Sequence, residues 1–154
     1  MKKFFVLVLL FSLDYFSKLI IFKTISLNKF IEIFPILDLA HIHNYGISFG
    51  LFANSISSWI IIIISIAIVA VIFYMMMDSS NIIEKWGYLL IIIGAISNIF
   101  DRIVNGYVVD FIYLHYKNFY WPAFNFADIY ITFGVLMILL NFLIKFKKTY
   151  KKEN

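Results

Sequence analysis

The 154-residue chain contains no cysteine. This absence excludes disulfide bonds, thiolate metal sites and a cysteine nucleophile. Charged residues are also scarce, since they make up 14% of the chain, whereas a soluble domain contains about a quarter. In contrast, 63% of the residues are hydrophobic and 20% are aromatic. The composition therefore indicates a membrane protein, and the length suits a single domain.

Four apolar stretches approach the roughly 20 residues that a membrane-spanning helix needs. They cover residues 4–22, 59–77, 86–102 and 129–146. We therefore predict an all-α membrane protein in which residues 1–154 form a single integral membrane domain with four transmembrane helices. Apolar and polar residues alternate over residues 37–44, which predicts a small extracytoplasmic β-sheet between helices 1 and 2.

The positive charges gather at the two ends of the chain. Lys2 and Lys3 precede the first apolar stretch, and a lysine-rich tail from Lys145 follows the last. Basic residues flank membrane helices on their cytoplasmic side, so we expect both termini in the cytoplasm and residues 23–58 and 103–128 outside it. The net charge of +4 is then explained by topology, and we expect no nucleic-acid partner.

The first apolar stretch also resembles a secretory signal peptide, because Lys2 and Lys3 precede an apolar run over residues 4–13. A signal peptide would be followed by small residues at a cleavage site. Residues 14–18 read Asp-Tyr-Phe-Ser-Lys instead. We therefore expect this stretch to be retained as the first helix.

Asp110 and Asp128 flank the connection between the last two apolar stretches. A charge near hydrocarbon is costly, so an ionisable residue in that position is a functional candidate. Two carboxylates held close together cannot both ionise easily, and a pair that shares one proton is the basis of an aspartic protease dyad. Asp128 could alternatively cap the start of the last helix.

Asp14 and Lys18 are four residues apart within the first stretch. This spacing places them on one face of a helix, where they can pair. A charge in hydrocarbon is tolerable once it is paired, so we favour a structural ion pair over a chemical role.

Polar residues recur every three or four positions along the third stretch. They are Gly94, Asn98, Asp101 and Asn105, and Arg102 lies beside them. Such a stripe must face protein or water rather than lipid. It is typical of helix–helix contacts, but its continuation towards Asp110 favours a site.

His41 and His43 lie on the same face of the predicted strand, as two metal ligands would. Catalytic zinc usually takes three protein ligands, and no third candidate is near in sequence. We therefore predict no metal and no cofactor.

Four sequence blocks together resemble the lipoprotein signal peptidases, the type II signal peptidases of bacteria. They are residues 14–18, like D-x-x-[ST]-K; residues 43–50, like N-x-G-x-x-F; residues 94–102 with 108–111, like G-A-x-x-N-x-x-D-R and V-V-D-F; and residues 124–128, like F-N-x-A-D. The blocks follow the family order and span most of the chain. One departure is Ile47-Ser48, where the family usually has small alanines.

The resemblance implies an aspartic endopeptidase of the bacterial inner membrane with its site at the extracytoplasmic face. Its substrate would be a diacylglyceryl-modified prolipoprotein, cut before the lipidated cysteine, so the expected partners are that precursor and membrane lipid. Family matching places the catalytic pair on Asp110 and Asp128. The positions that match substrate-binding or supporting residues are Asn44, Gly46, Asn98, Asp101, Arg102 and Asn125.

Two other functions fit part of the pattern. Asp14, Lys18 and Asp101 could form the path of a small proton- or ion-coupled transporter. Alternatively, Ser17 or Ser97 could act with Lys18 as a Ser-Lys protease. We expect a monomer under the peptidase interpretation, because one four-helix bundle can enclose such a site.

Overall fold

The computed structural model describes residues 2–47 and 56–153. Its helices are α1 (Lys2–Thr24), α2 (Ser58–Asp78), α3 (Ile82–Asn105) and α4 (Phe126–Glu153), and its strands are β1 (Phe30–Phe34), β2 (Leu37–Asn44), β3 (Val108–Tyr116) and β4 (Phe119–Tyr120). All four helices are long and apolar enough to cross a membrane. The predicted fold class is thereby confirmed, and each helix continues beyond its predicted ends.

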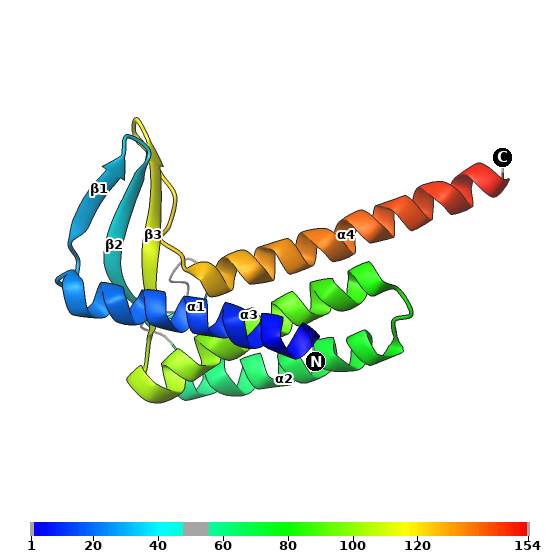
Figure 1. Ribbon diagram of the computed structural model, residues 1–154, viewed down its shortest axis with the longest axis horizontal. Helices are drawn as coiled ribbons and strands as arrows, with labels where there is room; N and C mark the ends of the chain where they lie inside the picture. Colours follow the sequence, from blue (N-terminus) through cyan, green and yellow to red (C-terminus); the bar gives the residue numbers. More distant parts are fainter. Residues whose placement is uncertain (1, 48–55, 154) are drawn as a thin grey trace.

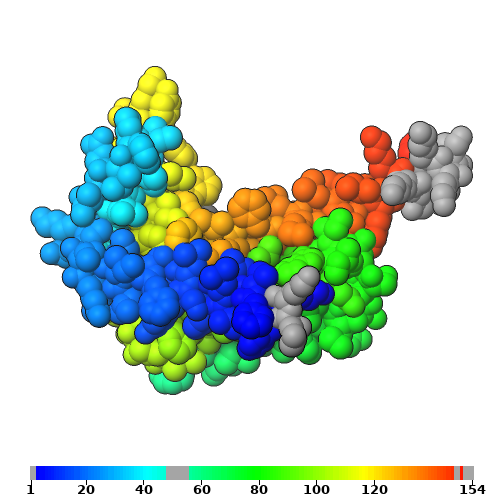
Figure 2. Space-filling model, in the orientation of Figure 1, coloured from blue at the N-terminus to red at the C-terminus, as the bar shows by residue number. Residues whose placement is uncertain are grey.

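The helices run side by side in one general direction, and the sheet stands across one end of them (Figure 1). The start of α1 and the end of α4 both lie away from the sheet. Figure 2 shows α4 projecting beyond the other helices. Large apolar side chains cover the outer helix faces: Ile63 is 65% exposed and Phe142 62%. Apolar surface of this extent requires lipid around it.

The sheet is antiparallel with strand order β1-β2-β3-β4. Its first two strands occupy the connection where the alternating pattern predicted strands. The sheet is larger than predicted, because β3 and β4 come from the connection between α3 and α4. Residues 108–111 at the start of β3 are all buried. A strand buried on both faces shows no alternation, so its period gave no signal.

The C-terminal end of α1 packs against β3. Ile21 and Ile25 form a buried cluster with Val109 and Phe111. These two strand residues flank Asp110, so the contact with α1 fixes the part of β3 that carries this carboxylate.

Glycines allow α3 and α4 to cross closely. A Cβ atom built on Gly87 would lie 2.8 Å from the carbonyl oxygen of Gly134, and one on Gly134 would lie 2.5 Å from that of Gly87. A Cβ on Gly94 would collide with the carbonyl oxygen of Ala127. Small residues at such crossings bring membrane helices into backbone contact. Here the crossing also sets the start of α4 against the middle of α3.

Candidate active site

Strand pairing places Asp110 beside Asn44. Asn44 lies opposite Val108 and Ile42 opposite Asp110, so Asn44 and Asp110 are diagonal neighbours whose side chains share one face of the sheet. The Nδ2 atom of Asn44 donates a hydrogen bond to Oδ2 of Asp110 at 2.9 Å. The register between β2 and β3 shifts just before this point, between Leu39 and Ile42.

Asp128 lies in the first turn of α4. Its Oδ2 atom accepts a hydrogen bond from the backbone N–H of Asn125 at 3.1 Å, and its own N–H donates to Oδ1 of Asn125 at 3.1 Å. This reciprocal arrangement is a capping box. Asp128 therefore caps the helix through one oxygen, while its Oδ1 accepts from Nδ2 of Asn98 at 2.9 Å.

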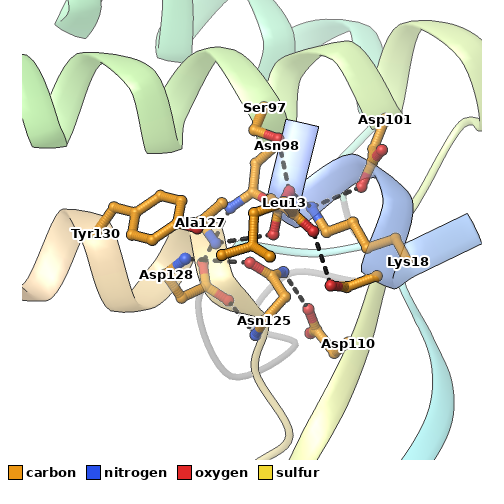
Figure 3. Close-up of polar contacts among 12 residues, drawn as sticks. Leu13, Lys18, Ser97, Asn98, Asp101, Asp110, Asn125, Ala127, Asp128 and Tyr130 are labelled. Carbon is orange, nitrogen blue, oxygen red and sulfur yellow. Dashed lines mark hydrogen bonds and ion pairs between the residues drawn. The ribbon is translucent and has the colours of Figure 1, made fainter. Parts of the chain in front are cut away.

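Asn125 joins the two acids. Its side chain is fully buried, and its Nδ2 atom donates to Oδ1 of Asp110 at 2.7 Å. Figure 3 shows Asn125 between Asp110 and Asp128. Asn125 thus binds the carboxylate of Asp110 through its side chain and that of Asp128 through its backbone N–H, and it holds β3 against the start of α4.

Burial raises the pKa of Asp110 to about 7, and the negative charge of Asp128 acts in the same direction. Hydrogen bonds from Asn44 and Asn125 and the charge of Lys18 oppose this rise. A buried carboxyl beside a second carboxyl holds its proton more tightly than one in water. Near neutral pH the site can therefore hold one proton between two acids.

Lys18 lies at the centre of a buried ion cluster that it forms with Asp14 and Asp101. Its Nζ atom is 2.6 Å from Oδ2 of Asp14 and 2.8 Å from Oδ2 of Asp101. Asp14 also accepts hydrogen bonds from Ser97 Oγ at 2.5 Å and from the backbone N–H of Ala127 at 2.9 Å. The cluster therefore connects α1, α3 and α4.

Sequence reasoning missed the parts that Ser97 and Ala127 play in this cluster. Ser97 lies three residues after Gly94 and four before Asp101, so its helical spacing was the available signal. The contact at Ala127 uses a backbone N–H, for which a sequence gives no signal.

Arg102 connects α3 to the segment after β2. Its Nη2 atom donates to the carbonyl oxygen of Gly46 at 2.5 Å, and its Nη1 to that of Asn98 at 3.3 Å. The Nε atom is buried and has no hydrogen-bond partner among the described residues. Gly46 is held in turn, since its N–H donates to Oδ1 of Asn44 at 2.9 Å.

The two acids line a cavity of about 510 Å³. Its other polar lining includes Asn44, Ser65, Asn98, Arg102, Asn125 and Thr132, and its apolar lining includes Ile47, Ile68, Ile91, Ile131 and Phe133. The cavity therefore lies among α2, α3, α4 and the sheet, with hydrocarbon-like walls next to the carboxylates. Ser48, the second residue of the departure noted in the sequence, lies outside the described residues.

Residues 6–144 match the family described as signal peptidase (SPase) II. The chain belongs to this signal peptidase II family. It is similar to the lipoprotein signal peptidase of Wigglesworthia glossinidia brevipalpis, with 39% identity over 88% of this chain and 90% of the relative. It is also 40% identical to that of Pelagibacter ubique (strain HTCC1062), over 96% of this chain and 92% of the relative. This member of the signal peptidase II family is thus a peptidase of the bacterial membrane.

The fold of this signal peptidase II family member is also similar to a solved structure. That structure is described as "Bacterial membrane enzyme structure by the in meso method at 2.3 A resolution". The TM-score is 0.87 with 27% identity, and the alignment covers 96% of this chain and 90% of the other. The arrangement of membrane helices and sheet is therefore that of a known membrane enzyme.

The contacts of the serines disagree with a Ser-Lys protease. The Oγ atom of Ser17 donates to the carbonyl oxygen of Leu13 at 2.7 Å, and that of Ser97 donates to Asp14. The Nζ atom of Lys18 is directed at the carboxylates of Asp14 and Asp101. Neither serine lines the cavity beside the acids.

Other candidate residues of this signal peptidase II family member lie apart from the acids. Asn105 is exposed and is the last residue of α3. Gly106 caps that helix with a φ of +83°, which suits glycine. His41 and His43 contact each other, with 3.0 Å between their Nε2 atoms. Among the described residues, no group of three or more His, Asp or Glu side chains could hold a metal ion.

Proposed function

We propose that this protein is an aspartic endopeptidase that removes the signal peptide from diacylglyceryl-modified prolipoproteins by cutting before the lipidated cysteine. The observation that carries the proposal is the pairing of Asp110 with Asp128 through Asn125 on the wall of a largely apolar cavity. The names of the similar lipoprotein signal peptidases support the same substrate.

The proposed chemistry needs an activated water and a proton donor. The ionised member of the pair removes a proton from water, which then attacks the scissile carbonyl carbon. The protonated member donates its proton towards the carbonyl oxygen, and a proton is later passed to the leaving amine. The amides of Asn44, Asn98 and Asn125 hold the carboxylates in place during this exchange. This mechanism uses no metal and no cofactor.

The cavity suits a substrate that is anchored in lipid. Its apolar lining comes partly from α2, α3 and α4, so acyl chains can stay in hydrocarbon while the scissile bond reaches the acids. We propose that Arg102, which lines the cavity, holds a carbonyl oxygen of the precursor through its planar guanidinium group. The acids, their partners and the cavity lining come from one chain, so we expect a monomer to be active.

A comparison of lipidated and unmodified precursor tests the substrate. Binding energy from the acyl chains positions the scissile bond, and misplacement by 1 Å can cost about a hundredfold in rate. We therefore expect purified protein to release the signal peptide from the unmodified precursor about a hundredfold more slowly, as measured by mass spectrometry. A cysteine-to-serine precursor, which cannot be lipidated, is the matched control. Equal rates would contradict the lipoprotein assignment and leave a general membrane protease.

We also propose that both termini face the cytoplasm and that the sheet and the acids face the other side of the bacterial inner membrane. The lysines at both chain ends support this orientation. The start of α1 and the end of α4, which lie away from the sheet, support it as well (Figure 1). The chain contains no cysteine, so single cysteines can be labelled without background.

A His115→Cys variant should react with an impermeant thiol reagent in cells whose outer membrane is permeable, because β3 lies outside in this topology. Lys147→Cys, near the end of α4, should react only after the inner membrane is opened. The reverse pattern of labelling would overturn the proposed orientation.

The three residues of the transporter alternative are buried away from the cavity. Asp14, Lys18 and Asp101 are 0%, 3% and 5% exposed, and none of them is among the residues that line the cavity. They bind one another and the start of α4 instead. This arrangement suits a structural cluster better than an ion path.

A further inference from the structure

A chain of hydrogen bonds connects Lys18 with Asp128. The Nζ atom of Lys18 donates to Oδ1 of Asn98 at 3.0 Å, and Nδ2 of Asn98 donates to Oδ1 of Asp128 at 2.9 Å. The three side chains come from α1, α3 and α4 (Figure 3). The amide of Asn98 thus bridges an ammonium group and a carboxylate.

The chemistry of the two ends fixes the orientation of this amide. An ammonium group can only donate hydrogen bonds, and an ionised carboxylate can only accept them. Lys18 therefore holds the Oδ1 atom of Asn98, which leaves Nδ2 as the atom that faces Asp128. Without Lys18, the amide could rotate and place an oxygen against the oxygen of Asp128.

Lys18 is itself held rigidly. Asp14 and Asp101 bind its ammonium group, and Asp14 is fixed by Ser97 and by the backbone N–H of Ala127. The Lys18 side chain is 4% exposed, so water cannot replace these partners. The cluster has more contacts than a pair that only neutralises charge would need.

We propose that Lys18 is a positioning residue, which holds the Asn98 amide so that it donates to Asp128 and keeps that carboxylate ionised as the base. The inference rests on the proposed function, because it assigns a role within that site. A donor to a carboxylate stabilises its charged form, whereas an acceptor facing it favours protonation. Loss of Lys18 should therefore protonate Asp128 at a higher pH.

The pH dependence of the pair also depends on the charges around it. These are Asp14 and Lys18 on α1, Asp101 and Arg102 on α3, and the two acids themselves on β3 and α4. A test must therefore change the contact with Asn98 without changing the net charge. The combined variant Lys18→Met with Asp101→Asn removes one positive and one negative charge, and Asp14 keeps the hydrogen bonds from Ser97 and Ala127.

The test is the pH profile of kcat and KM with lipidated precursor. We expect kcat of the combined variant to fall about tenfold or more, because the general base is held less well. The acid limb of its kcat–pH profile should move to higher pH by about 0.5 to 1 unit. KM should change little, because Lys18 does not line the cavity. Lys145→Met is the matched control, since Lys145 pairs with Glu84, and its profile should match the wild type.

Two further variants decide the role. In an Asn98→Ala background, the combined substitution should move the acid limb no further, because the proposed effect passes through Asn98. If the combined variant does not fold, Asn98→Leu replaces it, since Lys18 stays paired with its carboxylates while Asp128 loses its donor at unchanged net charge. An acid limb at the wild-type position in either variant would overturn the proposal, as would a shift that persists without Asn98.

Infrared titration of the protonated carboxyl band separates this inference from the proposed function. The band of Asp128, identified by its loss in Asp128→Asn, should appear at higher pH in the combined variant without any substrate present. If the wild type cleaves no lipidated precursor, the proposed function fails, but a shifted band still supports the role of Lys18. An unshifted band overturns that role whatever the activity.

Discussion

Asp110→Asn and Asp128→Asn should each reduce cleavage of the lipidated precursor by about 10²- to 10⁴-fold, the range that general acid–base groups contribute. Asparagine keeps the size and shape of aspartate but cannot accept a proton from water or hold a shared one. Cleavage is measured with purified protein under single-turnover conditions. Circular dichroism and size-exclusion chromatography should show that both variants keep the helices and remain monodisperse.

The double variant should be hardly slower than either single variant, because residues that act as a unit are strongly non-additive. Glu32→Gln is the matched control, since Glu32 is an exposed carboxylate on β1 outside the cavity. Asp101→Asn is the nearer comparison, because Asp101 is a buried acid that pairs with Lys18. If Asp110→Asn stayed active while a stable Asp101→Asn variant lost the chemical step, our choice of the pair would be wrong.

The helices could be predicted from composition, because four apolar stretches have few other stable forms in a membrane. The ends of the helices could not be predicted in this way. Helix α3 begins at Ile82 and α4 continues to Glu153, and both include polar residues that lie outside the hydrocarbon. Asp110 was predicted as part of a connection, but it lies on β3. A short apolar run buried on both faces gives no period from which to recognise a strand.

The two acids could be selected from sequence because carboxylates near hydrocarbon are costly. Their partners depend on long-range contacts that no local pattern contains. Lys18 and Asn98 are 80 residues apart, and Asn44 reaches Asp110 only through the register of β2 and β3. The spacing of Asp14 and Lys18 predicted an ion pair, but not that the pair would contact the start of α4.

The crossing of α3 and α4 is the packing feature on which the site depends most. A Cβ atom on Gly94 would collide with the carbonyl oxygen of Ala127 and lie 2.8 Å from Cγ1 of Ile131. Asn98 is one helical turn beyond Gly94, and Asp128 directly follows Ala127. The contact at Gly94 therefore sets the distance across which Asn98 reaches Asp128.

Gly94→Ala should lower the free energy of unfolding by about 1–3 kcal/mol, as overpacking does, and Gly94→Ile should prevent the helices from meeting. Thermal unfolding in detergent measures the first effect, and the yield of monodisperse protein the second. Val104→Phe is the control, because it adds similar bulk to α3 at a residue that is 61% exposed.

Activity should respond to Gly94→Ala more strongly than stability does. The carbonyl of Ala127 cannot move without shifting the first turn of α4, and a small shift there lengthens the 2.9 Å hydrogen bond from Asn98 to Asp128. Displacement of a catalytic group by about 1 Å can cost a hundredfold in rate, so cleavage should fall steeply at temperatures where the variant is still folded. Wild-type activity in a folded Gly94→Ala variant would show that the two acids keep their geometry without this crossing.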